Sequence, residues 1–261
     1  LWKVRRFLLP KFVLLKELCP RLPIYIGLSF YPMLKNKKGL YILLFSVHGL
    51  IRSYDLEMGR DADTGGQVKY VLELARNLAG RPEVARVDLF TRMIRDKKVS
   101  PDYSIEVEPI CDDARIIRVP CGGGKYIRKE LLWPHLDEFI DKTLRFLKKE
   151  PRNPSLFHGH YADAGYIAMT LATLYGVPFV FTGHSLGLGK QVKLLEEGAS
   201  LEEINRKYFM ADRVLVEEDI LSYADLVVTS TEQEIREQYG LYKNHSLPHY
   251  IVNPPGLDLD R

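Results

Sequence analysis

The residues most able to do chemistry are glycines and polar side chains gathered in four short segments. One of these, residues 63–67 (DTGGQ), directly precedes a helical pattern. Its two glycines would let backbone N–H groups approach a ligand closely. A helix N-terminus adds the partial positive charge that suits a diphosphate or sugar oxygens. The alternative is a plain helix start, capped by Asp63 or Thr64, with no ligand.

Two further segments carry histidines. Residues 158–165 (HGHYADAG) are expected to form a polar loop after a strand, presenting His160 and Asp163 to a sugar. In residues 182–187 (TGHSLG), His184 follows a strand directly and would point into a cleft. A neutral histidine there could bond a sugar hydroxyl or stabilise charge on a departing group. The alternative is a loop histidine satisfied by backbone carbonyls.

The same side chains leave a metal-dependent hydrolase open, because imidazole and carboxylate groups are good zinc ligands. Its ligands would be the histidines and the aspartate of the two segments: His158, His160, Asp163 and His184. Asp61 and Asp63 also form a DxD pattern, although a capping role for Asp63 is the simpler interpretation. Ser185 lacks the GxSxG surroundings of a hydrolase nucleophile.

Three basic residues are candidates to hold a phosphate: Lys125, Lys190 and Arg213. Residues 122–125 (GGGK) are rich in glycine but do not form a Walker loop, because Lys125 is followed by Tyr126 rather than by Ser or Thr. For a single basic side chain, a solvated surface charge is the competing interpretation.

Strands must alternate with helices to position these segments. Apolar runs predict strands at 40–46, 87–91, 114–119, 156–158, 178–182 and 226–230. Helical spacing predicts helices at 66–79, 136–149, 166–175, 200–222 and 232–239. This alternation indicates an α/β fold with a single doubly wound, Rossmann-like parallel sheet. All four polar segments then follow strands at the carboxyl edge, where such sheets bind ligands.

Composition is that of an ordinary globular protein: 261 residues, 46% of them apolar and 27% charged. No apolar run approaches the roughly 20 residues of a membrane-spanning helix. The three cysteines (Cys19, Cys111 and Cys121) form no CxxC pair, so a disulfide framework is not expected. A reducing, cytoplasmic location is the expectation.

Charge is divided unevenly along the chain. Residues 1–38 carry nine Lys or Arg and one acidic residue, Glu17, whereas the net charge of the whole chain is only +3. We expect 1–38 to be a basic leader with little order and 39–261 to be the folded domain. Contact of the leader with an anionic membrane is the alternative. The folded part is mildly acidic, which argues against nucleic-acid binding.

Four motifs in this order resemble the sucrose-phosphate synthase and sucrose synthase group of glycosyltransferase family 4. They are residues 48–67 (HGLIRSYDLEMGRDADTGGQ), 125–134 (KYIRKELLWP), 158–165 and 181–190 (FTGHSLGLGK). The GHSLG form of the last motif is closer to sucrose-phosphate synthase. The resemblance implies a GT-B glycosyltransferase, of which 39–261 would be the N-terminal, acceptor-side domain. It further implies transfer of glucose from UDP-glucose to fructose 6-phosphate, with retention and without an essential metal or other cofactor.

The resemblance also assigns residue roles. Gly65, Gly66 and Gln67 would contact the donor's diphosphate and sugar, and His184 would act near the reacting carbon. The acceptor would meet the remaining candidates: Lys125, His160, Asp163, Lys190 and Arg213. Lys190 and Arg213 would take its phosphate.

The nucleotide-binding motifs of the second GT-B domain are expected after residues 253–256 (NPPG), and the 261 residues do not contain them. We therefore expect the chain to be an N-terminal fragment that binds sugar phosphate weakly and turns over negligibly alone. A sucrose-synthase-like enzyme, a non-catalytic sugar-phosphate-binding module and the metal-dependent hydrolase remain alternatives.

Overall fold

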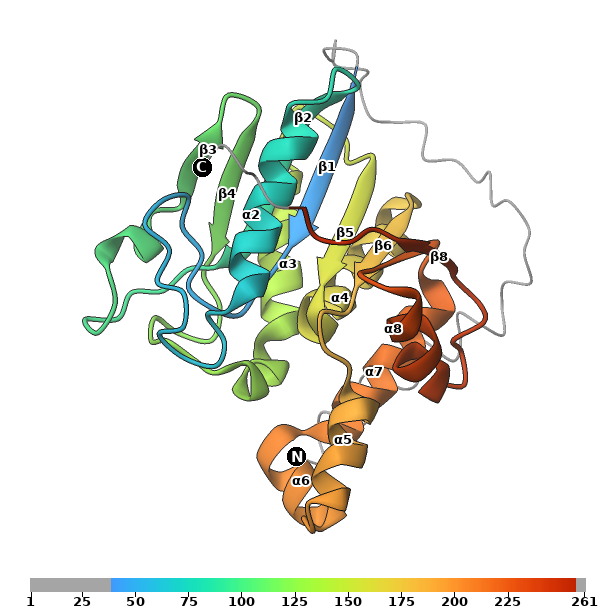
Figure 1. Ribbon diagram of the computed structural model, residues 1–261. Helices are drawn as coiled ribbons and strands as arrows, with labels where there is room; N and C mark the ends of the chain where they lie inside the picture. The colour runs from blue at the N-terminus through green and yellow to red at the C-terminus, as the bar shows by residue number, and fades with distance from the viewer. Residues whose placement is uncertain (1–38, 257–261) are drawn as a thin grey trace. The chain divides into compact units, whose positions relative to one another are not determined.

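A single eight-stranded sheet forms the centre of the computed structural model, which describes residues 39–256 (Figure 1). The leader predicted at 1–38 lies outside the described residues. The strands are β1 (Leu40–Phe45), β2 (Val84–Arg92), β3 (Val107–Cys111), β4 (Ala114–Val119), β5 (Leu156–His160), β6 (Phe179–Thr182), β7 (Leu226–Thr229) and β8 (His249–Val252).

Strand order in the sheet is β3-β4-β2-β1-β5-β6-β7-β8. Every neighbouring pair is parallel except β3 and β4, which are antiparallel at one edge. From β1 the chain builds outward on one side, and from β5 it builds outward on the other. The order therefore reverses between β1 and β5, which is where an open α/β sheet forms its ligand crevice. The predicted α/β fold with one doubly wound sheet is confirmed.

The helices are α2 (Gly66–Ala79), α3 (Leu136–Leu147), α4 (Tyr161–Tyr175), α5 (Gly187–Glu196), α6 (Leu201–Tyr208), α7 (Met210–Tyr223) and α8 (Glu232–Glu237). Short 3-10 turns occur at Pro101–Ser104, Lys129–Leu131, Trp133–His135 and Tyr239–Leu241. In Figure 1 strands β1 and β5 run downward, and α5 and α6 extend beyond their carboxyl ends.

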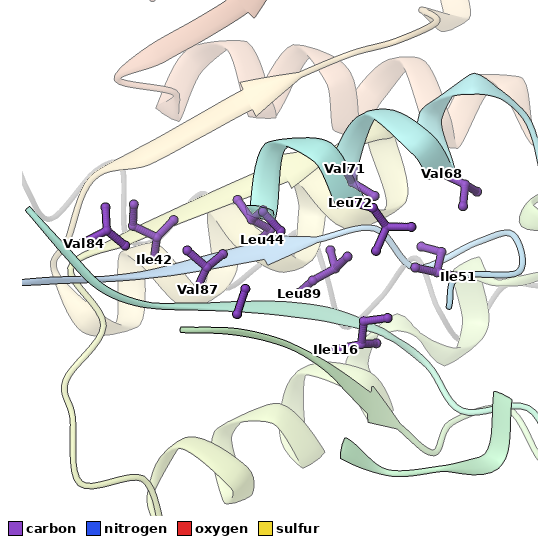
Figure 2. Packing of buried hydrophobic residues seen from close by; sticks show 12 residues of the cluster. Ile42, Leu44, Ile51, Val68, Val71, Leu72, Val84, Val87, Leu89 and Ile116 are labelled. Carbon is purple, nitrogen blue, oxygen red and sulfur yellow. The ribbon is translucent and has the colours of Figure 1, made fainter. Parts of the chain in front are cut away.

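The core beside the crevice is apolar on both faces of the central strands. β1 is buried from Tyr41 to Phe45, as its unbroken apolar run predicts. Figure 2 shows Val68, Val71 and Leu72 of α2 lying over β1 and β2. This packing fixes the N-terminus of α2 against the carboxyl end of β1.

Two local predictions were wrong, and two elements were missed. The polar loop expected after β5 does not exist, because β5 continues to His160 and α4 begins at Tyr161. The single helix expected over 200–222 is divided at Phe209, whose φ of 50° is incompatible with a continuous right-handed helix. Strand β3 and helix α5 were not predicted.

No helix in the described part of the chain combines the length and apolarity needed to cross a bilayer.

Candidate functional site

The carboxyl ends of three adjacent strands bring histidines together. His48 follows β1, His160 is the last residue of β5, and His184 lies two residues beyond β6. Nδ1 of His160 and Nε2 of His184 are 3.0 Å apart and share a hydrogen bond. The edge of the Tyr70 ring, from α2, packs against both imidazoles. The sequence-predicted His160 and His184 are therefore in direct contact, and Nε2 of His160 is buried without a hydrogen-bond partner among the described residues.

Burial keeps three histidines at this edge, His158, His160 and His184, neutral. It lowers the pKa of His158 to about 3 and that of His184 to about 4. The pKa of His160 is also well below its ordinary value, first because of burial and then because of the neighbouring imidazoles. Nε2 of His158 is hydrogen-bonded to Oγ1 of Thr182, 2.8 Å away. At neutral pH these rings can donate or accept hydrogen bonds but carry no charge.

Two non-glycine residues at this edge adopt left-handed backbone conformations. Tyr161, directly after β5, has φ of 75°, and His184 has φ of 55°. Such conformations cost about 1–2 kcal/mol for an ordinary residue and are concentrated at functional sites. Here they turn the chain sharply out of two neighbouring strands, so that both side chains lie at the crevice.

Asp163 lies in the first turn of α4 and orients His48. Nδ1 of His48 donates to Oδ2 of Asp163 over 2.8 Å, and both side chains are buried. The other carboxylate oxygen accepts from the backbone N–H of Ala164. His48 was not among the predicted site residues. Its place directly after an apolar strand was the signal that could have identified it.

The glycines at the N-terminus of α2 have free space beside them. A Cβ added to Gly65 or Gly66 would meet no atom within 4 Å, and Gly65 as N-cap makes no side-chain capping bond. Gln67 donates from Nε2 to Oγ of Ser46, 3.0 Å away at the end of β1. The free space beside both glycines is room that close approach of a diphosphate to the backbone would require.

Asp63 does not cap α2. Its carboxylate accepts from the backbone N–H of Lys129 over 2.9 Å and pairs with the Lys129 ammonium. Although burial opposes the charged form, these bonds hold the pKa of Asp63 below its ordinary value. The segment before α2 is thereby tied to the basic segment 125–134.

Lys129, Lys190 and Arg213 line one pocket together with Asp163 and Glu130. Three aromatic rings complete its walls: Trp133, Tyr161 and Tyr208. The Lys190 ammonium lies 3.8 Å from the centre of the Tyr208 ring. Burial, followed by the charge of Arg213, lowers the pKa of Lys190. Concentrated positive charge with aromatic walls suits an anionic sugar.

Arg213 is held firmly on α7. Its Nε donates to Glu217 over 2.8 Å, its Nη2 donates to the carbonyl of Ser185, and its guanidinium stacks 4.3 Å from the centre of the Tyr161 ring. It is only 4% exposed. A charge with so little freedom loses little entropy when it binds a ligand.

Lys125 does not join this pocket. Its side chain is exposed, and its backbone carbonyl accepts a hydrogen bond from the buried Arg92. The carbonyls of Cys121 and Gly123 accept from the same guanidinium, so residues 121–125 fold around Arg92. Lys129, four residues later, occupies the pocket instead. Motif 125–134 therefore contributes a cation, but a different lysine from the one expected.

Within residues 39–256, no three His, Cys, Asp or Glu side chains form a group that could hold a metal ion. Imidazoles of the cluster bond to one another and to Thr182, and Asp163 faces His48. This arrangement does not support the metal-dependent hydrolase.

Comparisons with known proteins agree with the fold and the motifs. The family model of the sucrose synthase first GT-B domain matches residues 37–258. Sucrose-phosphate synthase 4 of Arabidopsis thaliana is 43% identical over 86% of this chain. Sucrose-phosphate synthase of Zea mays is 42% identical over 85% of it. The chain spans about a quarter of the length of these relatives, 25% in both cases.

Among solved structures, sucrose-phosphate synthase from Thermosynechococcus elongatus matches 85% of this chain and 49% of its own, with a TM-score of 0.64 and 27% identity. Glucosyltransferase UGT2 of Phytolacca americana matches 85% of this chain and 55% of its own, with a TM-score of 0.51 and 10% identity, and shows the fold alone. The chain belongs to the sucrose-phosphate synthase and sucrose synthase family of GT-B glycosyltransferases, and the residues that the structure describes form the first, N-terminal GT-B domain.

Proposed function

We propose that this domain is the acceptor side of a retaining glucosyltransferase that moves glucose from UDP-glucose to fructose 6-phosphate. The family supports the reaction class, and the positive charge of the pocket supports a phosphorylated acceptor. A sugar phosphate would place its phosphate between Lys190 and Arg213, with Lys129 nearby. Its ring would contact the aromatic walls, and its hydroxyls would face Asp163 and the histidine cluster.

The donor would lie at the open N-terminus of α2. Gly65 and Gly66 would offer backbone N–H groups to its diphosphate, and Gln67 would contact its sugar. His184 would meet the glucose through Nδ1 as a neutral hydrogen-bonding group. Departure of UDP places negative charge on the diphosphate, so the helix N-terminus would stabilise charge as it develops. We place the protein in the cytoplasm, where sugar phosphates and nucleotide sugars are made.

One observation carries the proposal: Lys190 is half-buried among cations and, in the described part of the chain, forms no ion pair with a carboxylate. Lys129 and Arg213 are paired with Asp63 and Glu217, so the unpaired charge of Lys190 is what favours the binding of an anion. A sucrose-synthase-like enzyme would use fructose, which carries no phosphate and so would not need the positive charge of Lys190. The pocket therefore favours a phosphorylated acceptor.

A thermal-shift titration tests the acceptor. Fructose 6-phosphate is expected to raise the melting temperature of the chain, whereas fructose at the same concentration leaves it unchanged. Lys190→Ala should abolish the shift. Lys193→Ala, three residues on in the same helix and exposed, is the matched control and should keep it. Equal shifts with both sugars would favour the sucrose synthase alternative, and no shift with either would contradict the proposal.

A further inference from the structure

Glu217 is a buried carboxylate at the junction of α5, α7 and the segment that precedes β8. It is 1% exposed. Its oxygens accept from Nε of Arg213, from the backbone N–H of Gly187 at 2.9 Å, and from the hydroxyl of Tyr242. No sequence motif pointed to it. Three donors on one buried carboxylate satisfy its oxygens inside the protein.

The contact with Gly187 fixes the beginning of α5. A Cβ at this position would lie 2.7 Å from Oε2 of Glu217, so the carboxylate approaches the backbone as closely as glycine permits. The Tyr242 hydroxyl also accepts from the backbone N–H of Leu188 over 3.0 Å. Lys190 is in the first turn of this helix. The position of its backbone is thus set by Glu217 and Tyr242.

Glu217 also fixes Arg213, one helical turn earlier on α7. It holds Nε, while the carbonyl of Ser185 holds Nη2 and the Tyr161 ring covers one face. One carboxylate therefore contacts both elements that carry the pocket's phosphate-binding candidates. Its own oxygens are occupied by these donors and do not line the pocket.

We propose that Glu217 is a positioning residue that sets the separation and orientation of Arg213 and Lys190, so that both can bind one phosphate. The inference rests on the proposed function for the identity of the ligand. The geometric part, that Glu217 immobilises the Arg213 guanidinium, does not depend on it.

The matched pair of variants is Glu217→Gln and Glu218→Gln. Glu218, the next residue of α7, accepts from the backbone N–H groups of Lys243 and Asn244. Both glutamates tie α7 to the same segment. Of the two, Glu217 is the one that the described contacts place on Arg213. A general loss of stability would affect both variants, whereas the loss of Arg213 positioning is expected in Glu217→Gln alone.

Two measurements on the 261-residue chain are needed. The first is hydrogen exchange at Nε–H of Arg213, followed by nitrogen-15 NMR without ligand. We expect a slowly exchanging proton in the original chain and in Glu218→Gln, and fast exchange in Glu217→Gln. The second is the dissociation constant for fructose 6-phosphate. It should rise about tenfold in Glu217→Gln, equivalent to about 1.4 kcal/mol, and stay unchanged in Glu218→Gln.

Unchanged exchange and unchanged affinity in a folded Glu217→Gln would overturn the inference. If no form binds fructose 6-phosphate, the proposed function fails, while the exchange measurement still decides whether Glu217 immobilises Arg213. Should Glu217→Gln not fold, Tyr242→Phe replaces it, since it frees the start of α5 and leaves the Glu217–Arg213 bond. It should weaken fructose 6-phosphate binding while Nε–H stays protected. Affinity equal to that of the original chain would overturn the inference.

Discussion

At the scale of single residues, the histidine cluster links the site to the stability of the domain. Burial lowers the pKa of His158 to about 3, that of His184 to about 4, and that of His160 well below its ordinary value. In the unfolded chain a histidine titrates near 6.5. Below that pH the unfolded state binds protons that the folded state does not. The stability from these groups is therefore fully present above about pH 6.5 and is lost as pH falls.

We predict that His158→Gln makes unfolding less sensitive to acid. A buried histidine that stays neutral contributes a slope of up to about 1.4 kcal/mol per pH unit between its two pKa values. Urea unfolding measured from about pH 6.5 to about pH 4 should show the gap between original and variant shrinking as the pH falls. His249→Gln, which removes an exposed histidine, is the control and should run parallel to the original. Parallel curves for His158→Gln would contradict the assignment.

Most residues that the sequence predicted for the site do lie together in the structure, and Lys125 does not. His160, Asp163, His184, Lys190 and Arg213 do gather near one edge of the sheet. Lys129 was missed because the sequence of motif 125–134 does not show which of its two lysines, Lys125 or Lys129, faces the pocket. The hydrogen bonds of Arg92 to the loop at 121–125 decide which of them faces the pocket. Contacts between distant segments of this kind leave no periodic trace in the sequence.

At the scale of elements, the approach of β5 to α4 depends on two glycines. A Cβ on Gly159 would lie 2.6 Å from Cα of Gly165, a backbone atom that cannot turn aside. Any larger residue must push α4 away from the sheet. Asp163 and Tyr161, both at the site, lie in the part of α4 that would move.

Gly159→Ala should therefore destabilise the domain by about 1–3 kcal/mol, the usual range for overpacking a core. It should also weaken fructose 6-phosphate binding. Gly189→Ala, inside α5 with nothing within 4 Å of its added Cβ, should instead be neutral or stabilising by up to about 1 kcal/mol. Denaturant unfolding of both variants measures the difference. Similar behaviour of the two would show that the close approach is not maintained in solution.

Elements whose apolar residues repeat at a regular spacing were predicted well, and elements without such a repeat were not. Helix 66–79 matches α2 residue for residue, because its apolar positions repeat along one buried face. Strand β3 was missed because Pro109 and charged neighbours give it no alternation, and only an edge position allows that composition. Helix α5 buries only Gly187, so it has no apolar stripe to reveal it.

At the scale of the whole molecule, the described residues form one GT-B domain, and the relatives are about four times longer. Donor binding and charge stabilisation in a two-domain cleft draw on both halves. We predict that the 261-residue chain, given UDP-glucose and fructose 6-phosphate, releases UDP at a negligible rate. Sucrose-phosphate synthase from Thermosynechococcus elongatus, assayed alongside, is the positive control. Robust turnover by the chain alone would contradict this prediction.

The most direct measurement is a crystal structure of the chain with fructose 6-phosphate. We predict the phosphate between Lys190 and Arg213, within hydrogen-bond distance of both, with the sugar against the aromatic walls of the pocket. Phosphate bound at the loop of residues 122–125, beside Lys125 and with the pocket unchanged, would contradict the account.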